Sequence, residues 1–194
     1  MNRVGIILAG GYGTRLRPVT NAISKHLIPI HDKPMIFYPL SILMLMKIKK
    51  IFIVVTDNDY EQYEKLLGNG SNYGITIKYI FQKKPLGIAD GLFKCKEFVN
   101  NNRVCLILGD NIFYGSNLKL NFSNISNSKK NTIIGYRVSK PQNYGVINFN
   151  KKGKLISIVE KPKNPKSNYV VPGIYFYENN VFDYVKKIKP SKRN

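Results

Sequence analysis

Apolar runs rich in β-branched residues alternate with segments of helical character over the first 110 residues. Four of these runs predict β-strands, at residues 4–8, 51–56, 75–81 and 104–110. The segments between them predict helices, at about 35–48, 59–67 and 88–99. This order of elements indicates βαβ units, so we expect a mostly parallel sheet with helices on both faces.

After residue 130 the hydrophobic pattern changes to short strands separated by turns that contain Gly and Lys. We expect strands at 131–138, 145–149, 155–162 and 169–177, a tight turn at 151–153 and a helix at 180–188. The stretch near 121–131, rich in Asn, Ser and Lys, is interpreted as a loop. The β-rich part is either a second lobe or an antiparallel extension of the first sheet.

Length and composition limit the class of protein. The 194 residues are enough for one substantial domain, and 43% of them are hydrophobic, which supports a packed core. The longest apolar stretch, residues 35–46, contains Pro39 and is too short to span a bilayer, and no signal peptide opens the chain. We therefore expect no membrane partner and a cytoplasmic location. Cys95 and Cys105 have no partner at metal-ligand spacing and are expected to be buried free thiols.

The net charge of +20, from 31 Lys and Arg against 11 Asp and Glu, raises the question of an anionic partner. The lysines are accompanied by asparagine and spread evenly along the chain, which favours a compositional bias over a dedicated surface. Nucleic-acid binding would require basic residues interleaved with aromatic ones, and the sequence lacks that pattern. We expect no nucleic-acid partner, only weak and salt-dependent attraction of polyanions.

The first predicted strand leads directly into a loop rich in glycine and arginine, "LAGGYGTRLRP" at 8–18. A loop in this place lies at the carboxyl edge of a parallel sheet, where consecutive backbone N–H groups can form an anion-binding nest. Arg15 and Arg17 add positive charge, so the loop predicts phosphate binding. It is not a Walker A loop, because no Lys-Ser or Lys-Thr follows at the required spacing, and not a Rossmann fingerprint, because it runs into Pro18.

The longer stretch "GIILAGGYGTRLRPVTNAISKHLIPIHDKPMIFYPL" (5–40) resembles the signature of the sugar-1-phosphate nucleotidylyltransferases, most closely that of the glucose-1-phosphate thymidylyltransferases. The similarity continues in register through "LLGNGSNYGI" (66–75), "LGDNIFYG" (108–115), "YGVINF" (144–149), "EKPKNPKSNYVVPGIYFY" (160–177) and "KPS" (189–191). It implies an α/β, three-layer αβα Rossmann-like nucleotidyltransferase fold with a mostly parallel mixed sheet and a β-rich sugar-binding extension. It also implies a single domain over 1–194, with the nucleotide-binding half at 1–130 and part of the sugar-phosphate-binding half at 131–194.

The resemblance implies transfer of dTMP from dTTP to α-D-glucose 1-phosphate. The products are pyrophosphate and dTDP-glucose, which feeds the dTDP-rhamnose route to cell-surface polysaccharide. Such a transfer requires the protein mainly to position the two substrates and to neutralise the charge of their phosphates. By the resemblance, the residues that cradle the triphosphate with backbone amides are Gly10, Gly11, Gly13 and Thr14. Arg15 would lie against the β- and γ-phosphates, and Lys25 would bridge the α-phosphate and the leaving group. The alternative for Lys25 is an exposed surface charge.

Asp110 ends an apolar strand at the carboxyl edge of the predicted sheet, a costly place for an unpaired carboxylate. Binding of Mg²⁺ would relieve that cost, and the family uses this aspartate as a metal ligand. The alternative is a capping or turn aspartate, since Asn111 follows.

On the base side, Gln82 and Gly87 match the positions that pair with the thymine edge. Asp90 and Gly91 stand where thymidylyltransferases usually have Gln and Ala, which leaves the choice between dTTP and UTP open.

The remaining family positions concern the sugar phosphate. They match Asn111, Gly145, Glu160, Lys161 and the backbone of Val171. Glu160 would accept hydrogen bonds from sugar hydroxyls, and Lys161 would hold the phosphate. Each of the tyrosines nearby is expected to belong to the core rather than to a pocket wall: Tyr144, Tyr169 and Tyr175. The chemistry needs no general base, because a sugar phosphate is already anionic, so His26 and His31 are expected to be structural.

Members of this family continue beyond the length of this chain, with a second metal-binding aspartate in the later part. Arg193 falls where the family has an arginine just before that part. We therefore expect a chain that is incomplete at its C-terminus, with exposed apolar surface and tight association, and a homo-oligomer, since the family tends to form tetramers. Two hypotheses follow: an active thymidylyltransferase, or a nucleotide-binding module without useful turnover. A UTP- or CTP-using enzyme is the alternative among catalysts.

Overall fold

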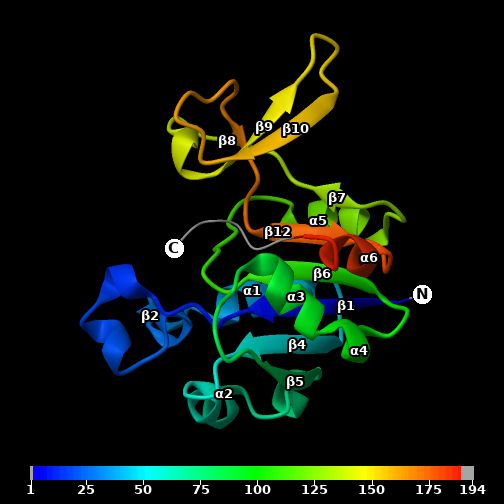
Figure 1. Ribbon diagram of the computed structural model, residues 1–194. Coiled ribbons are helices and arrows are strands. Elements are labelled where there is room, and N and C mark those ends of the chain that lie inside the picture. The colour runs from blue at the N-terminus through cyan, green and yellow to red at the C-terminus, as the bar shows by residue number, and fades with distance from the viewer. Residues whose placement is uncertain (1, 189–194) are drawn as a thin grey trace.

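The computed structural model of the chain describes residues 2–188 (Figure 1). Its centre is a six-stranded sheet with the order β5-β4-β1-β6-β12-β7. The four strands that form the parallel part are β1 (Arg3–Leu8), β4 (Lys50–Val55), β5 (Thr76–Phe81) and β6 (Arg103–Leu108). Each lies within two residues of its sequence-based bounds, because buried β-branched runs mark such strands clearly.

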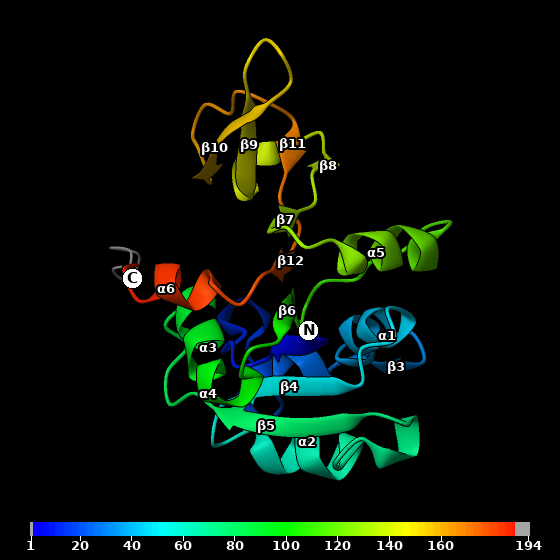
Figure 2. The same ribbon diagram turned by 90° about the vertical axis from the view of Figure 1, so that its right-hand side faces the viewer.

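A smaller, antiparallel sheet stands beyond one edge of the central sheet (Figures 1 and 2). Its order is β10-β9-β11-β8, with β8 (Tyr136–Arg137), β9 (Gly145–Phe149), β10 (Leu155–Glu160) and β11 (Tyr169–Val170). The turn between β9 and β10 falls at 151–153, as predicted, and is closed by hydrogen bonds between Asn150 and Lys154. A two-residue pair, β2 (Pro29–Ile30) and β3 (Lys33–Pro34), forms a separate hairpin.

Two segments predicted as single strands are each divided between the two sheets. Residues 131–138 form β7 (Thr132–Ile133) in the central sheet and then β8 in the small one. Residues 169–177 form β11 in the small sheet and then β12 (Ile174–Tyr177), antiparallel to β6. Gly135 and Pro172–Gly173 interrupt the two runs, because glycine and proline weaken a strand. The β-rich part is therefore both a second lobe and an antiparallel extension.

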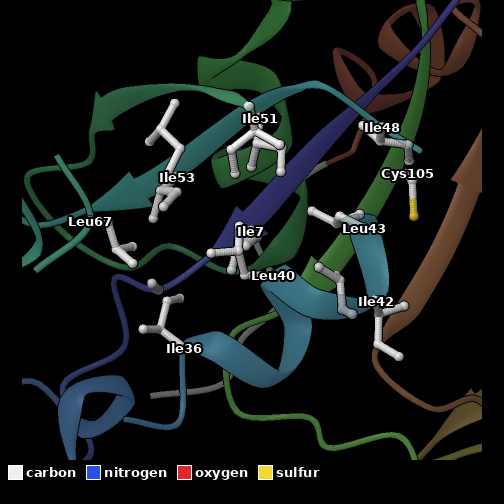
Figure 3. Packing of buried hydrophobic residues seen from close by; sticks show 14 of the residues in the cluster. Ile7, Ile36, Leu40, Ile42, Leu43, Ile48, Ile51, Ile53, Leu67 and Cys105 are labelled. Atoms are coloured by element: carbon white, nitrogen blue, oxygen red, sulfur yellow. The ribbon is translucent and has the colours of Figure 1, made fainter. Parts of the chain in front are cut away.

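Helices cover both faces of the central sheet, which confirms the three-layer arrangement (Figure 2). They are α1 (Phe37–Leu45), α2 (Tyr60–Leu67), α3 (Ile88–Lys94), α4 (Lys96–Val99), α5 (Leu118–Asn127) and α6 (Val181–Val185). Five short 3₁₀ turns are η1 (Thr14–Leu16), η2 (Val19–Asn21), η3 (Lys25–Leu27), η4 (Ser71–Tyr73) and η5 (Pro141–Asn143). One core cluster lies between the sheet and α1, α2 and α5, with Ile7, Leu40 and Leu43 at its centre (Figure 3). The other lies under α3, α4 and α6.

The helix α5 contradicts the loop expected near 121–131. Its many Asn and Ser residues make the helical pattern weak, and its short apolar face consists of Leu118, Phe122 and Ile125 at helical spacing. That face packs toward α1, and the Phe122 ring meets Phe113 edge-on with centroids 5.6 Å apart. The helix predicted at 88–99 is also divided, at Cys95, into α3 and α4, and the one predicted at 180–188 spans only Val181–Val185.

The buried side chain of Arg3 stabilises the end of the central sheet at which β1 begins. The Arg3 guanidinium donates hydrogen bonds to the carbonyls of Ser126, Val104, Tyr177 and Ser128, at 2.7–3.3 Å. Four acceptors compensate a buried charge that would otherwise be costly, and they tie β6, β12 and the end of α5 to β1. Both Cys95 and Cys105 are buried free thiols, as predicted.

No helix within residues 2–188 is long and apolar enough to cross a membrane. The "KPS" motif at 189–191 and Arg193 lie outside the described residues.

Candidate active site

The glycine loop leaves β1 at the carboxyl edge of the central sheet, where the neighbouring strands also end. Three backbone hydrogen bonds join these ends: Ala9 N–H to the Val54 carbonyl at 2.8 Å, Gly109 N–H to Leu8 at 2.9 Å and Gln82 N–H to Val55 at 2.9 Å. The loops that follow β1, β5 and β6 therefore begin side by side. This edge is where ligands bind in sheets of this kind.

Within the loop, Gly13 has a conformation that side chains disfavour. Its φ is 59°, and a Cβ atom there would lie 2.9 Å from Thr20 Cγ2 and 3.0 Å from Lys25 Cβ. The Thr20 hydroxyl and the Leu16 N–H both donate to the Gly13 carbonyl, which fixes the turn into η1. Gly13 thus lets the loop lie directly against Lys25.

The rest of the loop is open to solvent. Gly11, Thr14, Arg15 and Arg17 are exposed, and a Cβ at Gly11 would meet nothing within 4 Å. Gly10 is buried against Gln82 and Val55. The loop can therefore offer backbone N–H groups and two guanidinium groups to an anion without first breaking contacts to the body of the protein.

Lys25 and Asp110 form an ion pair beside the glycine loop. Lys25 Nζ donates to Asp110 Oδ2 at 2.5 Å, and the two side chains are 21% and 37% exposed. Asn111 Nδ2 donates to the other carboxylate oxygen at 3.0 Å. Burial acts to raise the pKa of Asp110, but the hydrogen bond and the charge of Lys25 outweigh it, so the pKa is lowered below its usual value. The carboxylate is held ionised, and Lys25 is not an isolated surface charge.

His26 lies beneath this pair in a buried polar cluster. Its Nδ1 is 3.2 Å from the Tyr63 hydroxyl and 3.5 Å from Ser24 Oγ, and the Tyr63 hydroxyl also lies 3.3 Å from the Ala9 carbonyl. Burial, and after it the charge of Lys25, lowers the pKa of His26 to about 4. The neutral imidazole thus packs under the loop, which agrees with the expected structural role. Sequence reasoning missed Ser24 and Tyr63, since only the fold brings α2 to residues 24–26.

On the base side, Gln82 is 5% exposed and Gly87 precedes α3 with a φ of 104°. Gln82 Nε2 donates to Asp90 Oδ2 at 2.5 Å. From the sequence, Asp90 was noted only as a difference from the residue usual in the family, and no role was predicted for it. The structure places it in direct contact with the residue expected to read the base.

The residues expected at the sugar phosphate gather where the small sheet meets the central one. Gly145 pairs with Glu160 across β9 and β10, and its Cβ position lies 3.2 Å from Glu160 Oε2. The Val171 N–H donates to the Gly145 carbonyl at 2.9 Å. Lys161 follows β10 with a φ of 45°. Asn111 connects this region to Asp110, because its Oδ1 accepts from the Gly173 N–H at 3.0 Å.

The prediction that the nearby tyrosines belong to the core is wrong for two of them. Tyr144 is 47% exposed and Tyr169 is 43% exposed. Tyr169 lies on β11 of the small sheet and Tyr144 directly precedes β9, and neither side chain is enclosed there. Tyr175, on the central sheet, stacks on Tyr177 at 5.9 Å and is half-buried.

Residues 4–194 match the family described as nucleotidyl transferase. The chain belongs to this family. It is 45% identical over 190 residues to glucose-1-phosphate thymidylyltransferase of Neisseria meningitidis, 46% over 192 residues to that of Xanthomonas campestris and 44% over 189 residues to that of Mycolicibacterium smegmatis. These alignments cover 97–98% of this chain and 65–66% of the relatives. The chain thus spans slightly less than two thirds of their length.

Solved structures of the nucleotidyl transferase family agree with this placement. A structure named as glucose-1-phosphate thymidylyltransferase from Bacillus anthracis, in complex with sucrose, superposes with a TM-score of 0.90 at 40% identity, covering 97% of this chain and 76% of that one. A UDP-glucose pyrophosphorylase complexed with UDP-glucose superposes with a TM-score of 0.84 at 26% identity, covering 100% and 83%. The α/β fold expected from the sequence is therefore confirmed.

The donor set at this nucleotidyl transferase site suits a metal ion that is shared with a substrate. Mg²⁺ prefers oxygen ligands and is commonly held through one or two carboxylates together with phosphate oxygens. Asp110 presents its carboxylate at the open edge of the sheet. Among residues 2–188, no group of three or more His, Cys, Asp and Glu converges to form an all-protein metal cage.

Proposed function

We propose that this nucleotidyl transferase transfers dTMP from dTTP to α-D-glucose 1-phosphate, giving dTDP-glucose and pyrophosphate. One observation carries the proposal: the Lys25–Asp110 pair lies against the glycine loop at the carboxyl edge of the sheet, in a chain whose relatives at 44–46% identity bear that name. We also infer that the dTDP-glucose serves polysaccharide synthesis by the dTDP-rhamnose route.

The chain's own residues would act mainly by placing charge. An oxygen of the sugar phosphate attacks the α-phosphorus of dTTP, and the bond from that phosphorus to the β-phosphate oxygen breaks as pyrophosphate leaves. The amides of Gly10, Gly11, Gly13 and Thr14 would hold the triphosphate. Arg15 would stabilise the departing pyrophosphate, and Lys25 would contact the α-phosphate.

Asp110 would hold a divalent metal ion, which we infer to be Mg²⁺. When bound, the ion would supply positive charge to the nucleotide phosphates. Asp110 is suited to this because its carboxylate is held ionised by Lys25 and oriented by Asn111. Once Asp110 holds the metal ion, Lys25 would be free to bind the phosphates.

The sugar phosphate would bind between the central and small sheets. Asn111, Gly145, Glu160, Lys161 and the Val171 backbone would form that side of the site. The absence of a side chain at Gly145 leaves space beside the Glu160 carboxylate, which can accept hydrogen bonds from hydroxyl groups. Lys161 would neutralise the phosphate.

Gln82 and Gly87 would face the base. In this arrangement residues 1–130 form the nucleotide half of a single domain, and residues 131–194 belong to its sugar-phosphate half.

A second candidate function is nucleotide binding without useful turnover. It is favoured by the lack of a converging acidic group at the site within residues 2–188, which leaves Asp110 as the carboxylate paired with Lys25. Under either function we place the protein in the cytoplasm, where dTTP and sugar phosphates are found, and expect a homo-oligomer.

The test is formation of nucleotide sugar by the purified chain, with Mg²⁺, glucose 1-phosphate and dTTP, UTP or CTP, followed by chromatography. We expect dTDP-glucose in excess over the other products. Asp110→Asn should lower the rate by about 100-fold or more, because it removes the carboxylate proposed to hold the metal ion whose positive charge acts on the phosphates. The matched control Asp32→Asn, at an exposed pair with Lys33, should leave it unchanged. A folded chain that binds dTTP but makes no product would favour the second function.

A further inference from the structure

We propose that Asp90 is a positioning residue that fixes the amide of Gln82 in one orientation. As a result, the site favours bases that present an N3–H group, thymine and uracil, over cytosine. The inference rests on the proposed function to the extent that Gln82 faces the base.

The contact that carries the proposal is the hydrogen bond from Gln82 Nε2 to Asp90 Oδ2, at 2.5 Å. Gln82 follows β5 and is buried, and its backbone N–H is anchored to the Val55 carbonyl. Asp90 is half-buried in the first turn of α3. Both partners therefore come from fixed elements, and the bond between them is partly buried.

The chemistry of the two groups determines which way the amide faces. An ionised carboxylate only accepts hydrogen bonds, whereas the glutamine amide has an accepting oxygen and a donating nitrogen. The nitrogen must therefore point toward Asp90. A rotated amide would bring two acceptor oxygens together in a partly buried place and lose the hydrogen bond.

With the nitrogen engaged, the Gln82 oxygen faces the glycine loop. Gln82 Oε1 lies 3.3 Å from the position that a Cβ atom would take at Gly10. A side chain at position 10 would crowd that oxygen. The loop residue proposed to hold the triphosphate and the amide proposed to face the base are thus adjacent, and the amide presents an acceptor to the space beside the loop.

This acceptor distinguishes the pyrimidines. Thymine and uracil carry a hydrogen on N3 and can donate it to the Gln82 oxygen. Cytosine has an acceptor at N3 and an amino group at C4, so it needs the opposite amide orientation. A site that leaves a buried polar group unpaired rejects the mismatched ligand strongly. A Gln at position 90, usual in the thymidylyltransferases that the sequence resembles, could donate or accept and would fix the amide less firmly.

The experiment is equilibrium binding of dTTP, dUTP and dCTP to the full chain by titration calorimetry, with Mg²⁺ present. The three ligands share their sugar and triphosphate, so the ratio of dissociation constants reports on the base alone. We expect the wild type to bind dTTP and dUTP about tenfold or more tightly than dCTP, the effect of one well-placed hydrogen bond. In Asp90→Asn, whose amide can face Gln82 with either group, this ratio should fall to about threefold or less.

The matched control is Glu97→Gln, which removes one negative charge from the neighbouring α4 and should leave the ratio at its wild-type value. Asp90→Ser tests the same ratio if Asp90→Asn does not fold. A variant that keeps the wild-type ratio would overturn the inference, while formation of dTDP-glucose could still support the proposed function. If the wild type binds dTTP selectively but makes no product, the inference stands and the proposed turnover fails. A folded chain that binds none of the three nucleotides overturns both.

Discussion

The buried histidine under the glycine loop shows how a single residue links stability to the site. His26 supports the backbone next to Lys25 through its contacts with Tyr63 and Ser24. In the folded chain its pKa is lowered to about 4, whereas an unfolded histidine titrates near 6.5. Between these values the unfolded chain binds the proton and the folded chain does not.

Stability should therefore fall as the pH is lowered from about 6.5 to about 4. The loss attributable to His26 is on the order of 3 kcal/mol, from the difference between the two pKa values. Above pH 6.5 this contribution to the free energy of unfolding is constant, and below about 4 the loss is complete. Urea unfolding at a series of pH values measures it. His26→Gln should flatten the slope in this window.

Other groups also titrate at low pH, so the comparison needs a matched variant. His31 is exposed and has a φ of 60°, which asparagine tolerates, so His31→Asn changes the other histidine without disturbing the core. His31→Asn should keep the steep slope. Equal slopes in the wild type and in His26→Gln would show that the buried imidazole does not control this transition.

At the scale of elements, the turn into η1 depends on Gly13 far more than on its neighbour Gly11. Gly13→Ala combines a left-handed backbone with contacts below 3.1 Å to Thr20 and Lys25, and should cost about 1–2 kcal/mol of unfolding free energy. Gly11→Ala meets nothing within 4 Å and should change stability by less than about 0.5 kcal/mol. Denaturant unfolding of both variants tests this. A larger loss for Gly11→Ala would mean that the loop has a different conformation.

The edge strand β10 should make the protein associate. It ends the small sheet, and Ile156 and Ile158 are 63% and 47% exposed. An apolar strand with an open edge is prone to pair with another copy. Ile156→Lys should therefore lower the apparent mass measured by light scattering at high protein concentration. Gln142→Lys adds the same charge in η5, outside the edge strand, and should have no such effect. A wild type that stays monomeric at all concentrations would contradict the prediction.

Elements differ in how well the sequence defines them. Strands β1, β4 and β6 were predictable because their β-branched runs are buried on both faces. The edge strand β5 was predictable because buried Ile77 and Ile80 stand among more exposed residues in a short β-branched and aromatic run. Helix α5 was not, since its apolar face consists of three residues among Asn and Ser. The division of residues 131–138 and 169–177 between two sheets was not predictable either, because strand periodicity says nothing about which neighbour a strand pairs with.

For the molecule as a whole, it was predictable which strand ends lie together at the candidate site. A glycine loop after the first strand and a carboxylate after the fourth must meet at one edge of a parallel sheet, and Lys25 and Asp110 do. What escaped prediction depends on how neighbouring elements pack in the completed fold. The Ser24–His26–Tyr63 cluster requires α2 to lie against residues 24–26, and the Gln82–Asp90 hydrogen bond joins the end of β5 to the first turn of α3.

If this edge of the sheet binds a nucleoside triphosphate, the chain should bind dTTP in the presence of Mg²⁺, which equilibrium titration measures. We expect Lys25→Ala and Arg15→Ala each to weaken binding about tenfold or more, because each removes a charge beside the phosphates. Lys33→Ala, which removes an exposed lysine paired with Asp32, should bind dTTP like the wild type. A folded chain that does not bind dTTP, or a Lys25→Ala variant that binds it as tightly as the wild type, would show that the nucleotide does not bind at this edge.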